Sequence, residues 1–152
     1  MKQLVMAVVL GAAFLAPGDA FAIGAVGNAT KCAPTISDAV IRMPPGKPRM
    51  MAGYFSIENT CDKAIVLNKV RSASFGDSQM HQTVVSGGVA RMRFLPSMTI
   101  AKGDRAVFRA GGLHLMMMKP KATIQPGQRI TVRLSGPGWS RSVPFVVQSM
   151  TD

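Results

Sequence analysis

The chain has 152 residues, of which 18 are lysine or arginine and 7 are aspartate or glutamate, so its net charge is +11 at pH 7. This length fits a single domain with a hydrophobic core. The basic residues form no runs and have no aromatic residues between them, which argues against nucleic-acid binding. The scattered acidic residues and 2 histidines form no catalytic triad, carboxylate pair or phosphate loop, and we expect no enzymatic activity.

Residues 1–22 have the features of a secretory signal peptide. Lys2 precedes an apolar stretch, and "AFA" at residues 20–22 is a small-x-small cleavage site. The apolar stretch is shorter than the roughly 20 residues that cross a bilayer. A retained N-terminal anchor is the alternative. We therefore expect export, cleavage after Ala22, and one domain at residues 23–152 that does not insert stably into the membrane.

The rest of the chain reads as short strands separated by segments rich in Gly, Pro, Asn, Asp and Ser. In chain order, the expected strands are residues 35–43, 51–59, 64–72, 80–85, 89–94, 105–110, 113–119, 129–134 and 142–149. Residues 74–78 and 135–140 are among the expected turns. No long, capped helical pattern occurs. This spacing predicts an all-β, antiparallel β-sandwich or barrel of the Greek-key type.

Two cysteines, Cys32 and Cys61, lie beyond the signal peptide. An even pair in an exported protein predicts one disulfide bond, with two free thiols as the alternative. The bond would close a loop of about 30 residues and stabilise the fold by roughly 3–4 kcal/mol. Their separation excludes a CxxC redox motif, so we interpret them as structural.

The segment "MHQTVVSGGVARMRF", residues 80–94, predicts a β-hairpin. If its two consecutive glycines form a two-residue turn, Thr83 faces Met92 and His81 faces Phe94. All four side chains then lie on one face, with His81 and Met92 as diagonal neighbours within reach of a shared ion.

The segment "GGLHLMMMKP", residues 111–120, contains the second histidine. The two-residue period of a strand places His114, Met116 and Met118 on one face and Met117 on the other. His81 follows the expected turn at residues 74–78 and His114 follows a Gly-Gly turn, so we expect these side chains at the end of the sandwich.

Imidazole and thioether groups together favour a soft metal ion. Thioethers suit Cu(I), imidazole binds copper, zinc or nickel, and hard cations prefer oxygen. In an oxidising compartment methionine keeps a soft sulfur that needs no deprotonation. The alternative is that the methionines only fill the core and the histidines are ordinary polar residues.

The spacing of these residues resembles a known family. His81, Met92, His114 and Met116 follow the pattern His-x10-Met-x21-His-x-Met, which is the copper-binding signature of the periplasmic copper chaperones with a PCuAC domain. The segments "MMAGYFSIEN", "VARMRF" and "AGGLHLMMMKP" also resemble segments of that family. Together, the similar segments extend over most of residues 35–148.

The resemblance implies a cupredoxin-like Greek-key β-sandwich that binds one Cu(I) per chain through His81, Met92, His114 and Met116. Met118 lies outside the signature, and its thioether makes it a possible auxiliary ligand. It further implies a periplasmic metallochaperone, expected to be a monomer, that passes copper toward the CuA centre of cytochrome c oxidase. Its partner would be the CuA-bearing oxidase subunit or a thiol-bearing assembly factor.

Other functions fit the sequence less well or remain open. A blue-copper electron carrier needs a cysteine ligand near the end of the fold, and no cysteine follows Cys61. A thiol–disulfide enzyme is opposed by the lack of CxxC. Copper storage or buffering, and a structural β module without metal, remain as alternatives.

Overall fold

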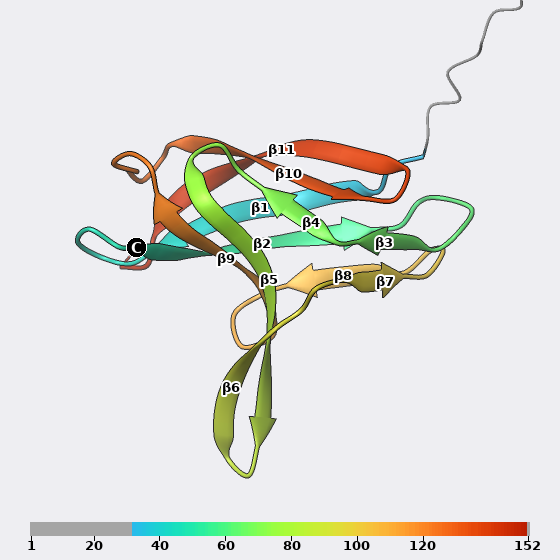
Figure 1. Ribbon diagram of the computed structural model, residues 1–152, viewed down its shortest axis with the longest axis horizontal. Coiled ribbons are helices and arrows are strands. Elements are labelled where there is room, and N and C mark those ends of the chain that lie inside the picture. Colours follow the sequence, from blue (N-terminus) through green and yellow to red (C-terminus); the bar gives the residue numbers. More distant parts are fainter. Residues whose placement is uncertain (1–31, 152) are drawn as a thin grey trace, which may run out of the picture.

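The computed structural model describes residues 32–151, and the predicted signal peptide lies outside them. Eleven strands and no helix form this part of the chain (Figure 1). They are β1 (Thr35–Met43), β2 (Met50–Glu58), β3 (Ile65–Leu67), β4 (Lys69–Arg71), β5 (Phe75–Ser86), β6 (Val89–Phe94), β7 (Met98–Ile100), β8 (Arg105–Phe108), β9 (Leu113–Pro120), β10 (Arg129–Gly136) and β11 (Trp139–Ser149). Over the described range, then, no helix is available to span a membrane. The all-β prediction is confirmed.

One large sheet contains nine of the strands, in the order β4-β10-β11-β1-β2-β8-β9-β5-β6, while β3 pairs with β7. The sheet curls, so that β4 at one end contacts β5 near the other. Most neighbours are antiparallel as predicted, but β8 and β9 share a short parallel contact, and β1 and β11 run parallel over four residue pairs. An extended parallel pair needs a long connection. For β1 and β11 this connection is the whole chain between the first and last strands, which no local sequence pattern reveals.

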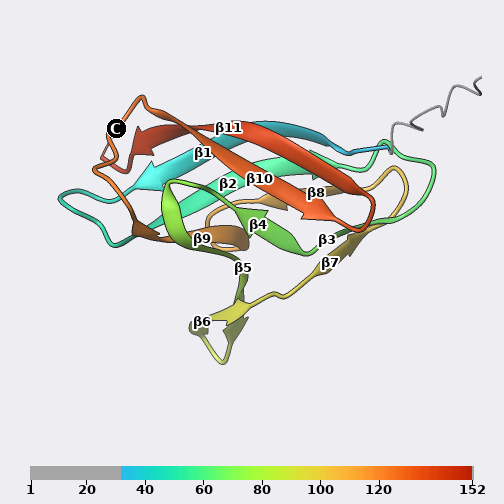
Figure 2. The same ribbon diagram turned by 45° about the horizontal axis from the view of Figure 1, so that its top comes forward.

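The β5–β6 hairpin projects from this curled body (Figures 1 and 2). β5 pairs with β9 from Phe75 to Gln82 and with β6 from His81 to Ser86, so that His81 and Gln82 have a neighbour on both sides. Beyond Gln82 the hairpin therefore has no third strand beside it. All six residues of β6 are exposed.

Some strand boundaries differ from the predictions. The turn predicted at residues 74–78 is wrong, because β5 already begins at Phe75 and its first residues pair with β9. Gly, Asp and Ser in this segment favour a turn locally, but pairing across the sheet overrides that preference. The strand predicted at residues 64–72 is broken at Asn68 into β3 and β4, which have different partners. The short strand β7 was not predicted, and the turn at residues 135–140 is shorter than expected.

The core lies between the layers of the curled sheet. Phe55 of β2 stacks on Phe108 of β8 with ring centroids 4.2 Å apart, and Phe145 of β11 meets Phe55 edge-on. β9 contributes Leu115 and Met117, both fully buried. Because side chains alternate along a strand, burying these two turns their neighbours to the opposite face of β9.

Cys32 and Cys61 form the predicted disulfide, with Cα atoms 5.7 Å apart. The loop that holds Cys61 is further fixed by the buried side chain of Asn59. Its amide nitrogen donates to the carbonyl oxygens of Lys63 and Ile100, and its oxygen accepts from the Cys61 N–H. The bond thus ties the start of the described chain to a loop anchored in the core.

Candidate metal centre

The register of β5, β6 and β9 brings both histidines to one face of the sheet. His81 lies directly opposite His114 across the β5–β9 ladder and opposite Phe94 across the β5–β6 ladder. The two imidazole ring centroids are 5.9 Å apart. Phe94 meets the His81 ring edge-on at 6.0 Å.

The hairpin has the register predicted from its sequence. Ser86 pairs with Val89, so the turn is Gly87-Gly88. Both glycines have positive φ, 58° and 77°, as a two-residue hairpin turn of this kind requires. Met92 consequently pairs with Thr83 and is a diagonal neighbour of His81.

His114 is held in one tautomer by a backbone carbonyl. Its Nδ1 lies 3.0 Å from the carbonyl oxygen of Gly112. A carbonyl oxygen can only accept, so Nδ1 carries the hydrogen and Nε2 keeps a lone pair. His114 is 5% exposed, and Nε2 is buried without a hydrogen-bond partner. This ring therefore has a nitrogen lone pair that is free to bind a metal ion.

His81 is oriented by two polar residues that precede it on β5. Asp77 accepts a hydrogen bond of 2.9 Å from the side-chain nitrogen of Gln79, which fixes the orientation of that amide. The Gln79 oxygen then accepts from Nε2 of His81 at 3.1 Å. Nδ1 of His81 is left as a lone pair, buried and without a partner. Histidine ligands of metals commonly donate their other N–H to a carboxylate or carbonyl in this way.

The electrostatic surroundings keep His81 neutral. Burial, and secondly the positive charge that His114 can carry, lower the pKa of His81 below its ordinary value of 6.5. A neutral imidazole is the form that binds a metal. His81 thus stays in the neutral form that can bind a metal at lower pH than an isolated histidine does.

The thioethers lie at different distances from the histidines. Met116, half-buried, is two residues from His114 on the same face and pairs with Gln79. Met92 lies on the projecting hairpin and is 64% exposed. Met118 shares this face but pairs with Asp77 and Met50, about 14 Å along the strand from His114.

Met117 lies on the other face and is fully buried, as the strand period predicts. It therefore belongs to the core and is separated from this face by the sheet.

The polar pair Asp77 and Gln79 was missed in the sequence because residues 74–78 were interpreted as a turn. Had the strand been extended backward from His81, its two-residue period would have placed both on the histidine face. His81 accordingly lies inside β5, not after a turn as expected, whereas His114 does follow the Gly111-Gly112 turn at the start of β9.

The donor set is chemically soft. Within residues 32–151, no three His, Cys, Asp or Glu side chains are grouped so as to hold a metal ion. An ion bound between the two imidazoles would therefore need methionine sulfur as its further protein ligands. Two neutral imidazoles with thioethers suit Cu(I) better than a hard cation.

The sequence matches the family model described as "Putative lipoprotein LpqE-like" over residues 34–136. The chain belongs to this family. No curated protein matches it closely enough to count as a relative.

Solved structures of PCuAC domains share its fold. The copper-bound PCuAC domain of PmoF2 has a TM-score of 0.63 at 17% identity, covering 75% of this chain and 91% of that one. The apo form of DR1885 from Deinococcus radiodurans has a TM-score of 0.59 at 24% identity and covers 97% of both chains. Its Cu(I) form has a TM-score of 0.58 at 25% identity, covering 81% of this chain and 82% of that one. The PCuAC-like, cupredoxin-like fold inferred from the resemblance is confirmed.

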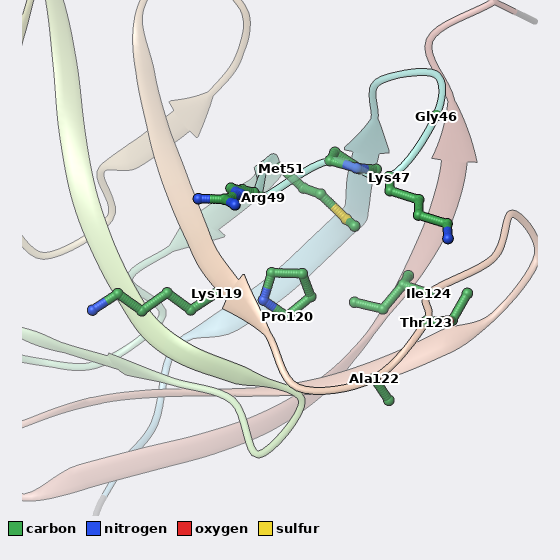
Figure 3. A pocket seen from close by; sticks show the side chains of 10 residues that line it. Gly46, Lys47, Arg49, Met51, Lys119, Pro120, Ala122, Thr123 and Ile124 are labelled. Carbon is green, nitrogen blue, oxygen red and sulfur yellow. The ribbon is translucent and has the colours of Figure 1, made fainter.

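The pocket of Figure 3 lies elsewhere, between the β1–β2 loop and the segment after β9. Its volume is about 460 Å³, and Met51, Pro120 and Ile124 form its apolar part beside the basic residues Lys47 and Arg49. Neither histidine lines it, and Met51 is on the core face of β2. The candidate metal centre beside the hairpin is thus separate from this pocket.

Proposed function

We propose that the protein is an exported carrier of Cu(I) that binds one ion per chain through His81, Met92, His114 and Met116. The observation that carries this proposal is the pair of facing imidazoles. In each ring one nitrogen forms a hydrogen bond that fixes the tautomer, and the other nitrogen is buried without a partner. The copper-bound PCuAC structures of the same fold support it.

The four proposed ligands have different roles. Nδ1 of His81 and Nε2 of His114 are held in place before the ion arrives, so they form the fixed part of the site. Met116 is half-buried beside them, and the exposed Met92 can move toward the ion from the hairpin. Met118 is too distant to join the same ion without rearrangement, so we propose it at most as an auxiliary ligand during entry or release.

The position of the site suits transfer better than permanent retention. Met92 is exposed on a projecting hairpin, where a second protein can approach it. We propose a periplasmic chaperone without catalytic activity, acting as a monomer, that passes copper toward a CuA-bearing oxidase subunit or a thiol-bearing assembly factor. The net charge of +11 favours encounter with an acidic acceptor.

The ligand assignment is tested by anaerobic titration with Cu(I) in competition with a chromophoric chelator. The wild type should bind one Cu(I), and the His114→Ala/Met116→Leu double variant should lose high-affinity binding. Met150→Leu removes an exposed methionine away from the site and serves as the control. Equal binding by the wild type and the double variant would remove the basis of the proposal.

Delivery is distinguished from storage by the kinetics of transfer to an apo CuA domain. Direct transfer predicts a rate that rises with acceptor concentration, exceeds dissociation of Cu(I) to solvent, and falls as added salt screens the charges. A rate independent of acceptor and salt would show release to solvent, and storage or buffering would replace delivery.

A further inference from the structure

The β5–β6 hairpin ends the sheet with an exposed strand edge. β6 pairs only with β5, and all of its residues are exposed. Of the seven large hydrophobic side chains exposed on the described residues, four belong to this hairpin: Val85, Val89, Met92 and Phe94. An open edge with apolar side chains is a site where another chain can add a strand.

The two faces of the hairpin differ in character. The ladder places Val85, Met92 and Phe94 on the face that carries His81, and Ala90 lies on the same face opposite Val85. The reverse face carries Arg91 and Arg93, for which the described residues provide no ion-pair partner. From Ala90 to Phe94, β6 therefore alternates between apolar side chains on the histidine face and positive charges on the reverse face.

The backbone groups that point outward can be assigned from the ladder. In an antiparallel pair, hydrogen-bonded and non-hydrogen-bonded residue pairs alternate, and the pair that closes a two-residue turn is hydrogen-bonded. Here that pair is Ser86–Val89, and the bond from Leu95 N–H to the Met80 carbonyl, 2.9 Å, keeps the same alternation. The N–H and C=O groups of Ala90, Met92 and Phe94 consequently face the free edge.

We infer that the free edge of β6 docks an extended segment of the copper-exchange partner, in which apolar side chains alternate with acidic ones. Backbone hydrogen bonds to Ala90, Met92 and Phe94 would add this segment as a further strand. Its apolar side chains would continue the histidine face, and its acidic ones would lie beside Arg91 and Arg93.

A second copy of the chain fits this edge less well. Pairing β6 with β6 would bring the arginines of two strongly basic molecules together on one face, which is unfavourable. An acidic partner instead neutralises them. A cross-strand neighbour of Met92 would lie about 5 Å from it on the histidine face, so a soft ligand at that position of the partner is placed to receive copper.

That the docked segment belongs to a copper-exchange partner rests on the proposed function, but docking itself can be tested without copper. Copper-free, ¹⁵N-labelled protein is titrated with a blocked peptide that alternates valine and glutamate and is slightly longer than β6. We expect amide shifts along β6 and slower hydrogen exchange at Ala90, Met92 and Phe94. A peptide that alternates valine and lysine should not bind.

Three variants make the test specific. Ala90→Pro removes an outward N–H at an edge position where proline is tolerated, and should abolish binding while Cu(I) stoichiometry is retained. Arg91→Glu/Arg93→Glu should weaken binding about tenfold or more. Arg129→Glu/Arg133→Glu makes the same charge change on exposed positions of β10 and should have no such effect.

Several results would overturn the inference. Equal binding of the lysine peptide, shifts confined to other strands, or unchanged binding by Ala90→Pro would each do so. Concentration-dependent shifts of β6 without peptide would assign the edge to self-association. If the wild-type protein docked the peptide but bound no Cu(I), the proposed function would be contradicted, whereas the inference that β6 docks an extended segment would still hold.

Discussion

Among single residues, the two histidines are held by different kinds of partner. His114 depends on a backbone carbonyl, which no substitution of a side chain removes. His81 depends on Gln79, and Gln79 on Asp77. The orientation of His81 is therefore open to test by mutation, whereas that of His114 is built into the chain.

Gln79→Leu should weaken Cu(I) binding by about tenfold, because His81 loses the bond that fixes its tautomer and ring orientation. Competition with a chromophoric Cu(I) chelator measures the affinity, and ¹⁵N NMR of the imidazole should show loss of the pure Nε2–H tautomer. Gln82→Leu, on the reverse face of the same strand, is the matched control. Unchanged affinity in Gln79→Leu would show that His81 needs no such support.

The lowered pKa of His81 predicts a pH dependence of stability in the copper-free protein. In the unfolded chain this histidine takes up a proton near pH 6.5, but in the folded protein it does so only at lower pH. Within that window the unfolded state binds more protons, so the free energy of unfolding decreases as pH falls. Urea denaturation at pH 8 and pH 5 should show a smaller decrease for His81→Gln than for the wild type. If the free energy of unfolding decreased equally in both proteins, the lowered pKa of His81 would not be the cause of the pH dependence.

At the level of strands, the sequence predicted the parts of the site that depend on local geometry. The Gly87-Gly88 turn set the register of the hairpin, and the two-residue period separated Met116 from Met117. The prediction from sequence failed where pairing between strands distant in the chain determines the structure. The start of β5 is extended only because β9 lies beside it, and the Asp77–Gln79 support of His81 was missed with it. The parallel contact of β1 with β11 has no local signal at all.

The disulfide that holds the loop between β2 and β3 should contribute to stability but not to copper binding. Reducing the Cys32–Cys61 bond should lower the free energy of unfolding by about 3–4 kcal/mol, since it frees a loop of some 30 residues in the unfolded chain. Cu(I) stoichiometry should remain one, because neither cysteine lies on β5, β6 or β9, the strands that carry the proposed ligands. Calorimetry with and without a reductant, followed by Cu(I) titration, measures both. Loss of copper on thiol blocking would make the cysteines ligands.

In the molecule as a whole, we expect the proposed copper binding to be coupled to folding. A ligand that binds only the folded state stabilises it, by about 2.7 kcal/mol at a free concentration one hundred times its dissociation constant. The face that carries the proposed ligands is formed by the β5–β6 hairpin together with β9, which lies further along the chain, so the unfolded chain has no equivalent site. Cu(I) should therefore raise the melting temperature, and above the dissociation constant this increase should grow with the logarithm of the free Cu(I) concentration.

The unpartnered nitrogen of His114 also implies a trade-off between stability and function. A buried lone pair with no partner costs about 1–3 kcal/mol in the copper-free protein, and the proposed Cu(I) ion would offset this cost. His114→Leu removes this nitrogen, and the Gly112 carbonyl still accepts from the Thr83 N–H at 3.0 Å. The copper-free variant should consequently melt higher than the copper-free wild type, yet lower than the copper-loaded wild type. A variant less stable than the copper-free wild type would mean that the histidine serves the fold. If the expected order holds, a homologue that no longer binds the metal would gain stability by losing His114. Retention of His114 would then indicate that the metal is still bound.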